Sequence, residues 1–220
     1  MTASSSPSSV QQDASVPDQY DRWARIYDRF WRRYMNHTLP VVQKMAAVAP
    51  GERVLDVACG TGELLHRIAQ TTPSADLTGV DLAPAMVARA RSKLRNVPHA
   101  QVEPVDAHHL PFEDASFDVL LCANTFHYFT HPAQVLSEAQ RVLRADGRLV
   151  ILDWCRDDWT CRIMDAVLPW VDPAYETCYT LDELTAHLAA ASLVPHDALR
   201  YRFDLVWGMM AVEAHPRSVS

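Results

Sequence analysis

The sequence lacks the features of membrane-spanning and nucleic-acid-binding proteins. No apolar run approaches the ~20 residues that a membrane-spanning helix needs, so no integral membrane segment is predicted. The N-terminal stretch has neither the basic leader nor the apolar core of a secretory signal. Positive charge is scarce, with 20 Lys and Arg against 27 Asp and Glu and a net charge of −7. Because nucleic-acid-binding proteins usually gather Lys and Arg on one face, no nucleic-acid partner is expected.

The cysteine and histidine spacings predict neither a disulfide framework nor a metal site. The five cysteines are odd in number and form no C-x-x-C pair, which predicts reduced thiols in a cytoplasmic protein. They are Cys59, Cys122, Cys155, Cys161 and Cys178. His127 and His131 are four residues apart, but Pro132 interrupts a helix through both, so no metal is predicted.

The composition changes twice along the chain. Residues 1–18 are Ser-rich and predict a disordered tail. Residues 19–48 predict a helical cap, because aromatic residues recur there at spacings of three and four and share one helical face. This face either packs on the body of the fold or covers a ligand as a lid. Residues 49–216 show no linker or repeat and predict one domain with one core.

From residue 53 onward, strand-like segments alternate with helical ones. Strands are predicted at residues 53–58, 76–81, 100–105, 117–123 and 148–154, and helices at 62–70, 84–94 and 132–143. This alternation predicts right-handed βαβ units and a parallel sheet. A capping box at Thr180 and Glu183 opens a further helix, and residues 198–204 and 205–213 predict an antiparallel hairpin. The predicted fold class is α/β: a doubly wound, Rossmann-like seven-stranded sheet, mostly parallel with an antiparallel C-terminal hairpin, plus the N-terminal helical cap.

A glycine-containing turn follows the first predicted strand, in VLDVACGTGELL at residues 54–65. In doubly wound sheets, ligands bind at the carboxyl ends of the strands. The dinucleotide fingerprint G-x-G-x-x-G/A fails here because Leu65 stands at its last position, and no lysine completes a P-loop. Asp56 and Glu63 would also repel a pyrophosphate. The turn therefore predicts a ligand with a cationic or zwitterionic part.

Two further acids end the next two predicted strands. Asp81 ends LTGVD, and a carboxylate there can accept hydrogen bonds from both hydroxyls of a ribose. Asp106 ends VEPVD and can accept from the exocyclic amine of adenine. Each acid taken alone is more often a turn or helix cap than a ligand contact. Together, behind this glycine turn, they predict ribose, adenine and a cationic centre without phosphate, which describes S-adenosylmethionine.

The chain resembles the class I S-adenosylmethionine-dependent methyltransferases, of the UbiE/Methyltransf_11-like type. VLDVACGTG is similar to their motif I and VDLAPAMVARAR to the segment after it. VDAHHLPFEDASFDVLLCANTFHYF resembles their adenine loop and fourth strand, and RVLRADGRLVILDW their fifth strand with its approach. The resemblance covers residues 50–154 and implies that residues 49–216 form the methyltransferase domain. Three departures are Ala58, where the fuller motif has glycine, Ala83, where Ser is usual, and the turn Ala145-Asp146-Gly147, where Pro-Gly-Gly is usual.

The resemblance implies S-adenosylmethionine as cofactor. The residues implied to bind it are Tyr27, Asp56, Ala58, Gly60, Thr61, Gly62, Asp81, Leu82, Met86, Asp106, Ala107, His108 and Asn124. In this assignment the glycines pass beneath the methionyl part and Asp56 meets its amino group directly or through water. Tyr27 closes over its carboxylate from the cap. Met86 packs either near the adenine or in the core.

Methyl transfer from a sulfonium needs mainly alignment and a dry pocket, and a base only where the acceptor must lose a proton. His127 is the candidate catalytic base, since an imidazole suits proton removal near neutral pH; otherwise it lines the pocket. The candidate substrate residues are Tyr20, His127, Trp154, Trp159 and Tyr179, whose rings form either an acceptor pocket or core packing.

The sequence therefore predicts an enzyme that methylates a small-molecule substrate: a phenol or quinone, a thiol, an amine or a lipid headgroup. The alternative is a non-catalytic S-adenosylmethionine-binding interaction protein. A nucleotide-dependent oxidoreductase is disfavoured by Leu65. The sequence leaves a homodimer open.

Overall fold

The computed structural model describes the backbone of residues 16–172 and 174–217 and the side chains from Trp31 onward, apart from those of 173 and 218–220. The predicted tail, residues 1–18, lies almost wholly outside this range. The predicted N-terminal helix is present as α1, Val16–Ala46. The chain divides into two compact units, residues 1–37 and 38–220, so α1 crosses from the first into the second. Within the second unit, Leu39, Val42 and Ala46 of α1 are buried.

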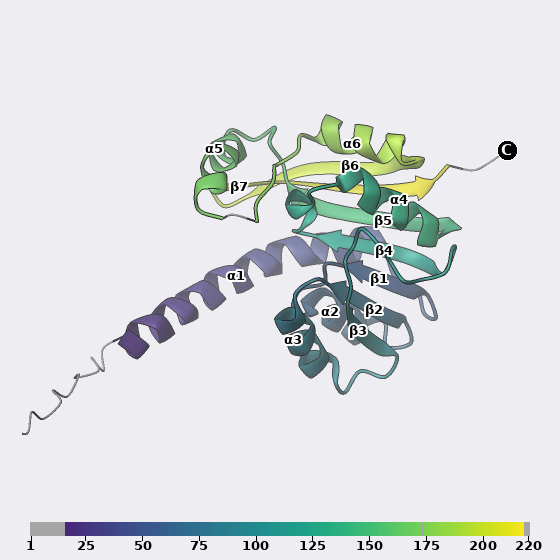
Figure 1. Ribbon diagram of the computed structural model, residues 1–220, viewed down its shortest axis with the longest axis horizontal. Coiled ribbons are helices and arrows are strands. Elements are labelled where there is room, and N and C mark those ends of the chain that lie inside the picture. Colours follow the sequence, from purple (N-terminus) through teal and green to yellow (C-terminus); the bar gives the residue numbers. More distant parts are fainter. Residues whose placement is uncertain (1–15, 173, 218–220) are drawn as a thin grey trace, which may run out of the picture. The chain divides into compact units, whose positions relative to one another are not determined.

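The second unit is built on one seven-stranded sheet with the order β3-β2-β1-β4-β5-β7-β6 (Figure 1). Its strands are β1 Arg53–Val57, β2 Asp76–Asp81, β3 Ala100–Pro104, β4 Phe117–Ala123, β5 Leu143–Trp154, β6 Leu193–Phe203 and β7 Trp207–Pro216. The first five pair in parallel, while β7 is antiparallel to β5 and β6. The predicted fold class is confirmed.

The helices of this unit connect the strands. They are α2 Glu63–Thr71, α3 Pro84–Leu94, α4 Pro132–Val142, α5 Trp159–Val167 and α6 Leu181–Ala190, with single 3₁₀ turns η1 Phe126–Tyr128 and η2 Leu168–Trp170. The predicted capping box is present: Thr180 accepts from the Glu183 amide, and the Glu183 side chain accepts from the Thr180 amide. In the described part of the chain, no helix combines the length and the apolar character needed to cross a bilayer.

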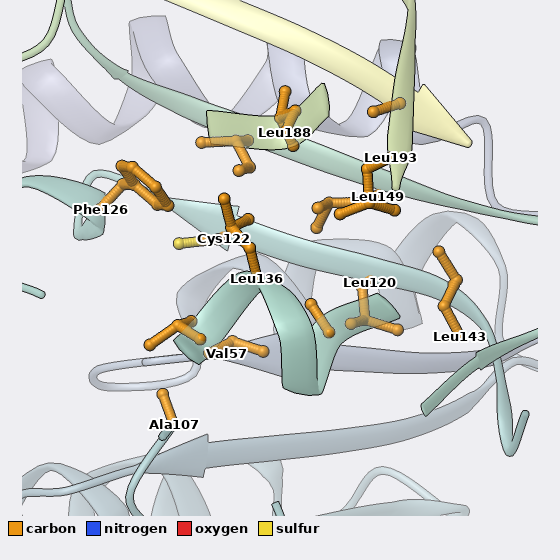
Figure 2. Close-up of a cluster of buried hydrophobic side chains, with 14 of the residues drawn as sticks. Val57, Ala107, Leu120, Cys122, Phe126, Leu136, Leu143, Leu149, Leu188 and Leu193 are labelled. Atoms are coloured by element: carbon orange, nitrogen blue, oxygen red, sulfur yellow. The ribbon is translucent and has the colours of Figure 1, made fainter. Parts of the chain in front are cut away.

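The core lies between the sheet and the helix pair α4 and α6. Because successive residues of a strand point to opposite faces, Leu55 and Val57 of β1 face this core while Val54 and Asp56 face the other side. Figure 2 shows Val57, Leu120 and Cys122 from the strands meeting Leu136 of α4 in this layer. Buried residues on both faces explain why the strands have nearly continuous apolar sequences.

Two strands begin earlier than predicted. β5 starts at Leu143 instead of Arg148, and a register shift near Phe117 and Val119 of β4 accommodates the extra residues. β6 starts at Leu193 instead of Ala198, although it contains Pro195. Pro is tolerated on an edge strand beside a bulge, and β6 is the edge strand with a register shift there. Helix α5 lies where the sequence predicted only an insert.

Candidate functional site

The turn after β1 is held in a left-handed backbone conformation. Ala58, Gly60 and Gly62 have φ angles of 56°, 55° and 71°. The amide of Cys59 donates to the Val80 carbonyl at 2.9 Å, which ties the turn to β2. A Cβ built on Gly60 would meet no atom within 4 Å, so the main chain there faces open space. A ligand could approach the main chain at Gly60 without meeting a side chain of the described residues.

Asp81 connects this turn to the start of α3. One carboxylate oxygen accepts from the Gly60 amide at 2.8 Å and the other from the Ala83 amide at 2.9 Å. An ionised carboxylate offers about four acceptor positions, so two hydroxyl donors can still be accommodated. Leu82 is 72% exposed and Met86 37% exposed in this segment, so the structure shows neither in the core.

Asp106 lies beside Asp81 at the same edge of the sheet. The Val105 amide donates to the Asp81 carbonyl at 3.2 Å, and β2 pairs directly with β3. One oxygen of Asp106 accepts from the His108 amide at 2.9 Å and pairs with His108 Nδ1 at 2.6 Å. These hydrogen bonds from His108 lower the pKa of Asp106. The second carboxylate oxygen has no such partner, whereas Ala107 is buried in the core (Figure 2).

Asp56 is the buried acid of the site, with 2% of its surface exposed. Burial first, and the charge of Asp81 second, raise its pKa to about 8. An acid in this state is a neutral carboxylic acid near pH 7 and loses its proton when a cationic group arrives. Asp56 therefore suits a ligand that carries an ammonium group.

The remaining cofactor candidates lie around the turn and after β4. Thr61 accepts a hydrogen bond from Lys93 Nζ at 3.1 Å, and Lys93 also pairs with Glu63 at 2.8 Å. Asn124 has a φ of 59° and donates its amide to the Leu152 carbonyl at 2.7 Å. Its side chain lies 3.3 Å from Thr38 Oγ1.

His127 is buried and paired with an acid that the sequence did not single out. His127 Nδ1 lies 2.7 Å from Asp153 Oδ1, and its amide donates to Asp153 Oδ2 at 2.8 Å. The ring of Trp154 stacks on that of His127 at 4.2 Å. The predicted base thus lies with Trp154 at the carboxyl ends of β4 and β5.

The other substrate candidates are not gathered there in the same way. Tyr179 contacts the rings of Phe126 and His187. Trp159, at the start of α5, is 61% exposed. The side chains of Tyr20 and Tyr27 lie outside the described residues, so their predicted contacts stay predictions.

Comparison with known proteins gives a consistent result. A family model described as a methyltransferase domain matches residues 55–151. The 27-O-demethylrifamycin SV methyltransferase of Amycolatopsis mediterranei is 30% identical over 200 residues, which are 81% of this chain and 73% of that protein. The chain belongs to the class I S-adenosylmethionine-dependent methyltransferases.

Other relatives of this methyltransferase match over a smaller share of their length. The ubiquinone/menaquinone biosynthesis C-methyltransferase UbiE of Geotalea uraniireducens is 40% identical over 150 residues, covering 64% of this chain and 60% of that protein. For several curated relatives the matched share is between 33% and 60% of their length. The crystal structure of the YcgJ protein from Bacillus subtilis has the same fold, with a TM-score of 0.71 at 21% identity, covering 84% of this chain and 100% of that one.

The residues of this methyltransferase fit the family's cofactor. The bare main chain at Gly60 leaves room for the ligand, the buried Asp56 suits an amino group, and Asp81 retains acceptor positions for hydroxyls. Asp106 keeps one carboxylate oxygen for an amine donor. The geometry of these four residues is compatible with S-adenosylmethionine.

The two turn glycines of the methyltransferase have different constraints, which gives a test. A Cβ at Gly62 would lie 3.0 Å from Ala90 Cβ, so any larger residue at the start of α2 would crowd α3. We expect Gly62→Ala to lower the free energy of unfolding by about 1–3 kcal/mol, from the left-handed conformation and the close contact. Chemical denaturation would measure this.

Gly60→Ala is the matched control. The added methyl group of Gly60→Ala meets open space, so this variant has the strained left-handed conformation but no close contact like that with Ala90. It should therefore lower the free energy of unfolding less than Gly62→Ala does. It should instead weaken binding of S-adenosylhomocysteine more than Gly62→Ala does, because the methyl group projects toward the ligand. The opposite ranking of the two variants would contradict the placement of the ligand over Gly60.

Sequence reasoning missed Asp153, although a signal for it was present. Asp153 follows three apolar residues in VILDW, as Asp56 follows two in VLDV. An acid inside an apolar strand must find hydrogen-bond donors when buried. The rule that singled out Asp56 also applies to Asp153.

Proposed function

We propose that the protein transfers the methyl group of S-adenosylmethionine to a small-molecule acceptor, a phenol or quinone, a thiol, an amine or a lipid headgroup. Family membership supports the cofactor, and named relatives act on different acceptors, a quinone precursor carbon and a rifamycin oxygen among them. The bound sulfonium supplies an electrophilic methyl group, so the protein contributes binding, alignment and exclusion of water.

The observation that carries this proposal is the open space above Gly60 beside the buried Asp56. We assign Asp56 to the amino group, Asp81 to the ribose and Asp106 to the adenine edge. Ala58, Thr61 and Gly62 shape the turn under the methionyl part, and Asn124, after β4, faces that part with its backbone. Leu82 and Met86 supply exposed apolar surface next to Asp81 for the adenine ring. His127, which follows β4 in the chain, is the proposed base.

We also propose a reducing compartment, the cytoplasm, because all five cysteines are free thiols and all are buried.

Two measurements test the function. Calorimetry should show binding of S-adenosylhomocysteine and none of NADH; binding of NADH alone would remove the proposal. Incubation with S-adenosylmethionine carrying a labelled methyl group should then label at least one compound among phenols, thiols, amines and phospholipids. Binding of S-adenosylhomocysteine without transfer to any of these classes would favour the non-catalytic interaction protein.

A further inference from the structure

His127 and Asp153 form a buried pair at the edge of the sheet where the strands end. His127 lies in η1, directly after β4, and Asp153 lies near the end of β5. Each is only 2% exposed. Asp153 contacts both the ring and the main chain of His127, at 2.7 Å and 2.8 Å. Two contacts to one carboxylate fix both the position and the rotation of the imidazole.

The hydrogen bonds of Asp153 determine which ring nitrogen carries the proton. Its oxygens also accept from the Trp154 amide at 2.7 Å, so the carboxylate receives two main-chain donors. These donors favour the ionised form, which accepts hydrogen bonds and donates none. His127 Nδ1 is therefore the protonated nitrogen, and Nε2 presents a lone pair.

Burial raises the pKa of several ionisable groups around this pair, whereas a hydrogen bond from Cys178 lowers the pKa of Cys161 to about 7. Burial raises the pKa of Cys122 on β4. Burial likewise raises the pKa values of Tyr175 and Tyr179. A hydrogen bond that Cys178 donates to Cys161, together with burial, raises the pKa of Cys178.

His127 Nε2 is buried and has no hydrogen-bond partner among the residues that the structure describes. Leaving a buried acceptor unpaired is destabilising. The ring cannot turn to relieve this, because Asp153 holds Nδ1 and the rings of Trp154 and Tyr128 each lie 4.2 Å from its centre. The fold therefore maintains an unsatisfied proton acceptor in a fixed orientation.

The His127–Asp153 pair and the proposed cofactor site both lie at the carboxyl ends of the parallel strands. β4 lies between β1 and β5, and neighbouring strands are about 4.8 Å apart. The ends of β1 and β5 are thus separated by two strand spacings, about 10 Å. His127, which follows β4, therefore lies at the same end of the sheet as the turn at Gly60.

We propose that Asp153 is the positioning residue that keeps His127 Nε2 as a proton acceptor, and that the methyl acceptor is therefore one that must lose a proton to react, a phenol or an enol. This inference rests on the proposed function. In the reaction, the acceptor O–H bond breaks and its proton goes to Nε2 of His127. The oxygen forms a bond to the methyl carbon, and the carbon–sulfur bond breaks with its electron pair remaining on sulfur. Asp153 stabilises the resulting imidazolium, which returns the proton to solvent. A neutral amine would need none of this.

A spectroscopic experiment tests the positioning role without turnover. Long-range ¹H–¹⁵N correlation spectra of the full-length protein should show His127 as the Nδ1–H tautomer near pH 8. Asp153→Asn removes the charge that fixes the proton, so a mixed or Nε2–H tautomer is expected. An Nε2–H tautomer in the unaltered protein would overturn the assignment.

A kinetic experiment tests the acceptor class, with phenols and the anilines of the same ring as probes. Methylation of the phenols should rise with pH, because this reaction needs a proton acceptor. His127→Gln and Asp153→Asn should each lower kcat on phenols by about 10²–10⁴-fold, abolish that rising limb, and leave the affinity for S-adenosylhomocysteine unchanged. The control His99→Asn, exposed at the opposite end of the sheet, should change nothing.

The outcomes separate this inference from the function on which it rests. Methylation of phenols at full rate by a folded His127→Gln variant, or methylation of anilines alone, would overturn the inference while leaving the methyltransferase activity intact. Absence of transfer to every acceptor class would remove both.

Discussion

Asp81→Ala is expected to weaken binding of S-adenosylhomocysteine by about 10- to 150-fold, which corresponds to the 1.5–3 kcal/mol typical of hydrogen bonds to a charged group. The variant loses the proposed acceptor for the ribose hydroxyls. It also releases the Gly60 and Ala83 amides, so the turn under the ligand is no longer tied to the end of β2. Titration calorimetry at fixed pH and salt would measure the change.

Two further variants separate these contributions. Asp81→Asn keeps an oxygen that can accept from one amide and should bind with intermediate affinity. Asp76→Ala removes an exposed acid from the other end of the same strand and should leave the affinity unchanged. Equal affinities for Asp81→Ala and the unaltered protein would contradict the ribose assignment.

Much of the fold could be predicted because local and long-range preferences agree in the strands. β2 and β4 have the predicted bounds, and β1 and β3 each end one residue earlier than predicted. These strands are buried on both faces, so their apolar runs end where the chain leaves the core. The turn at Gly60 could be predicted for the same reason, since its glycines follow directly on such a run.

The rest depends on contacts that the sequence does not show. Ala145, Asp146 and Gly147 are typical of a turn, yet they continue β5. A Cβ at Gly147 would lie 2.8 Å from the Asp118 carbonyl, so glycine serves a close approach to β4 there instead of a turn. Helix α5 starts with Asp158 as its N-cap, accepting from the Thr160 amide at 3.0 Å. Asp158 also pairs with Arg202 of β6, a contact between segments far apart in sequence.

In the candidate site, too, some residue positions could be predicted from the sequence and others depend on contacts that it does not show. The positions of Asp56, Gly60 and Asp81 follow from strand order, because the carboxyl ends of parallel strands meet at one edge. The pairing of His127 with Asp153 could not be predicted, because it joins η1 to β5 across 26 residues. The hydrogen bonds between His108 and Asp106 could not be predicted either, because they depend on the path of the loop after β3.

Asp56→Asn is expected to remove a pH dependence of stability from the cofactor-free protein. Asp56 has a pKa of about 8 in the folded state, against about 3.9 in an unfolded chain. The folded state therefore binds more protons than the unfolded state between these values, and stability falls as the pH rises through this window. Between pH 5 and pH 8 the loss amounts to as much as about 4 kcal/mol, at 1.36 kcal/mol per pH unit. Urea denaturation at several pH values would measure it.

The asparagine variant stays neutral, so its stability should decline less over this range, and at pH 8 it should exceed that of the unaltered protein. Asp76→Asn, at an exposed position, should keep the pH dependence of the unaltered protein.

The proton held by Asp56 should also be released when the ligand binds. If the ammonium group of S-adenosylhomocysteine meets Asp56, the acid ionises, and calorimetry at pH 7 in phosphate and in Tris should reveal release of nearly one proton per ligand. Asp56→Asn should release none. Equal heats in the two buffers for the unaltered protein would mean that Asp56 does not meet the amino group, even if the ligand still binds.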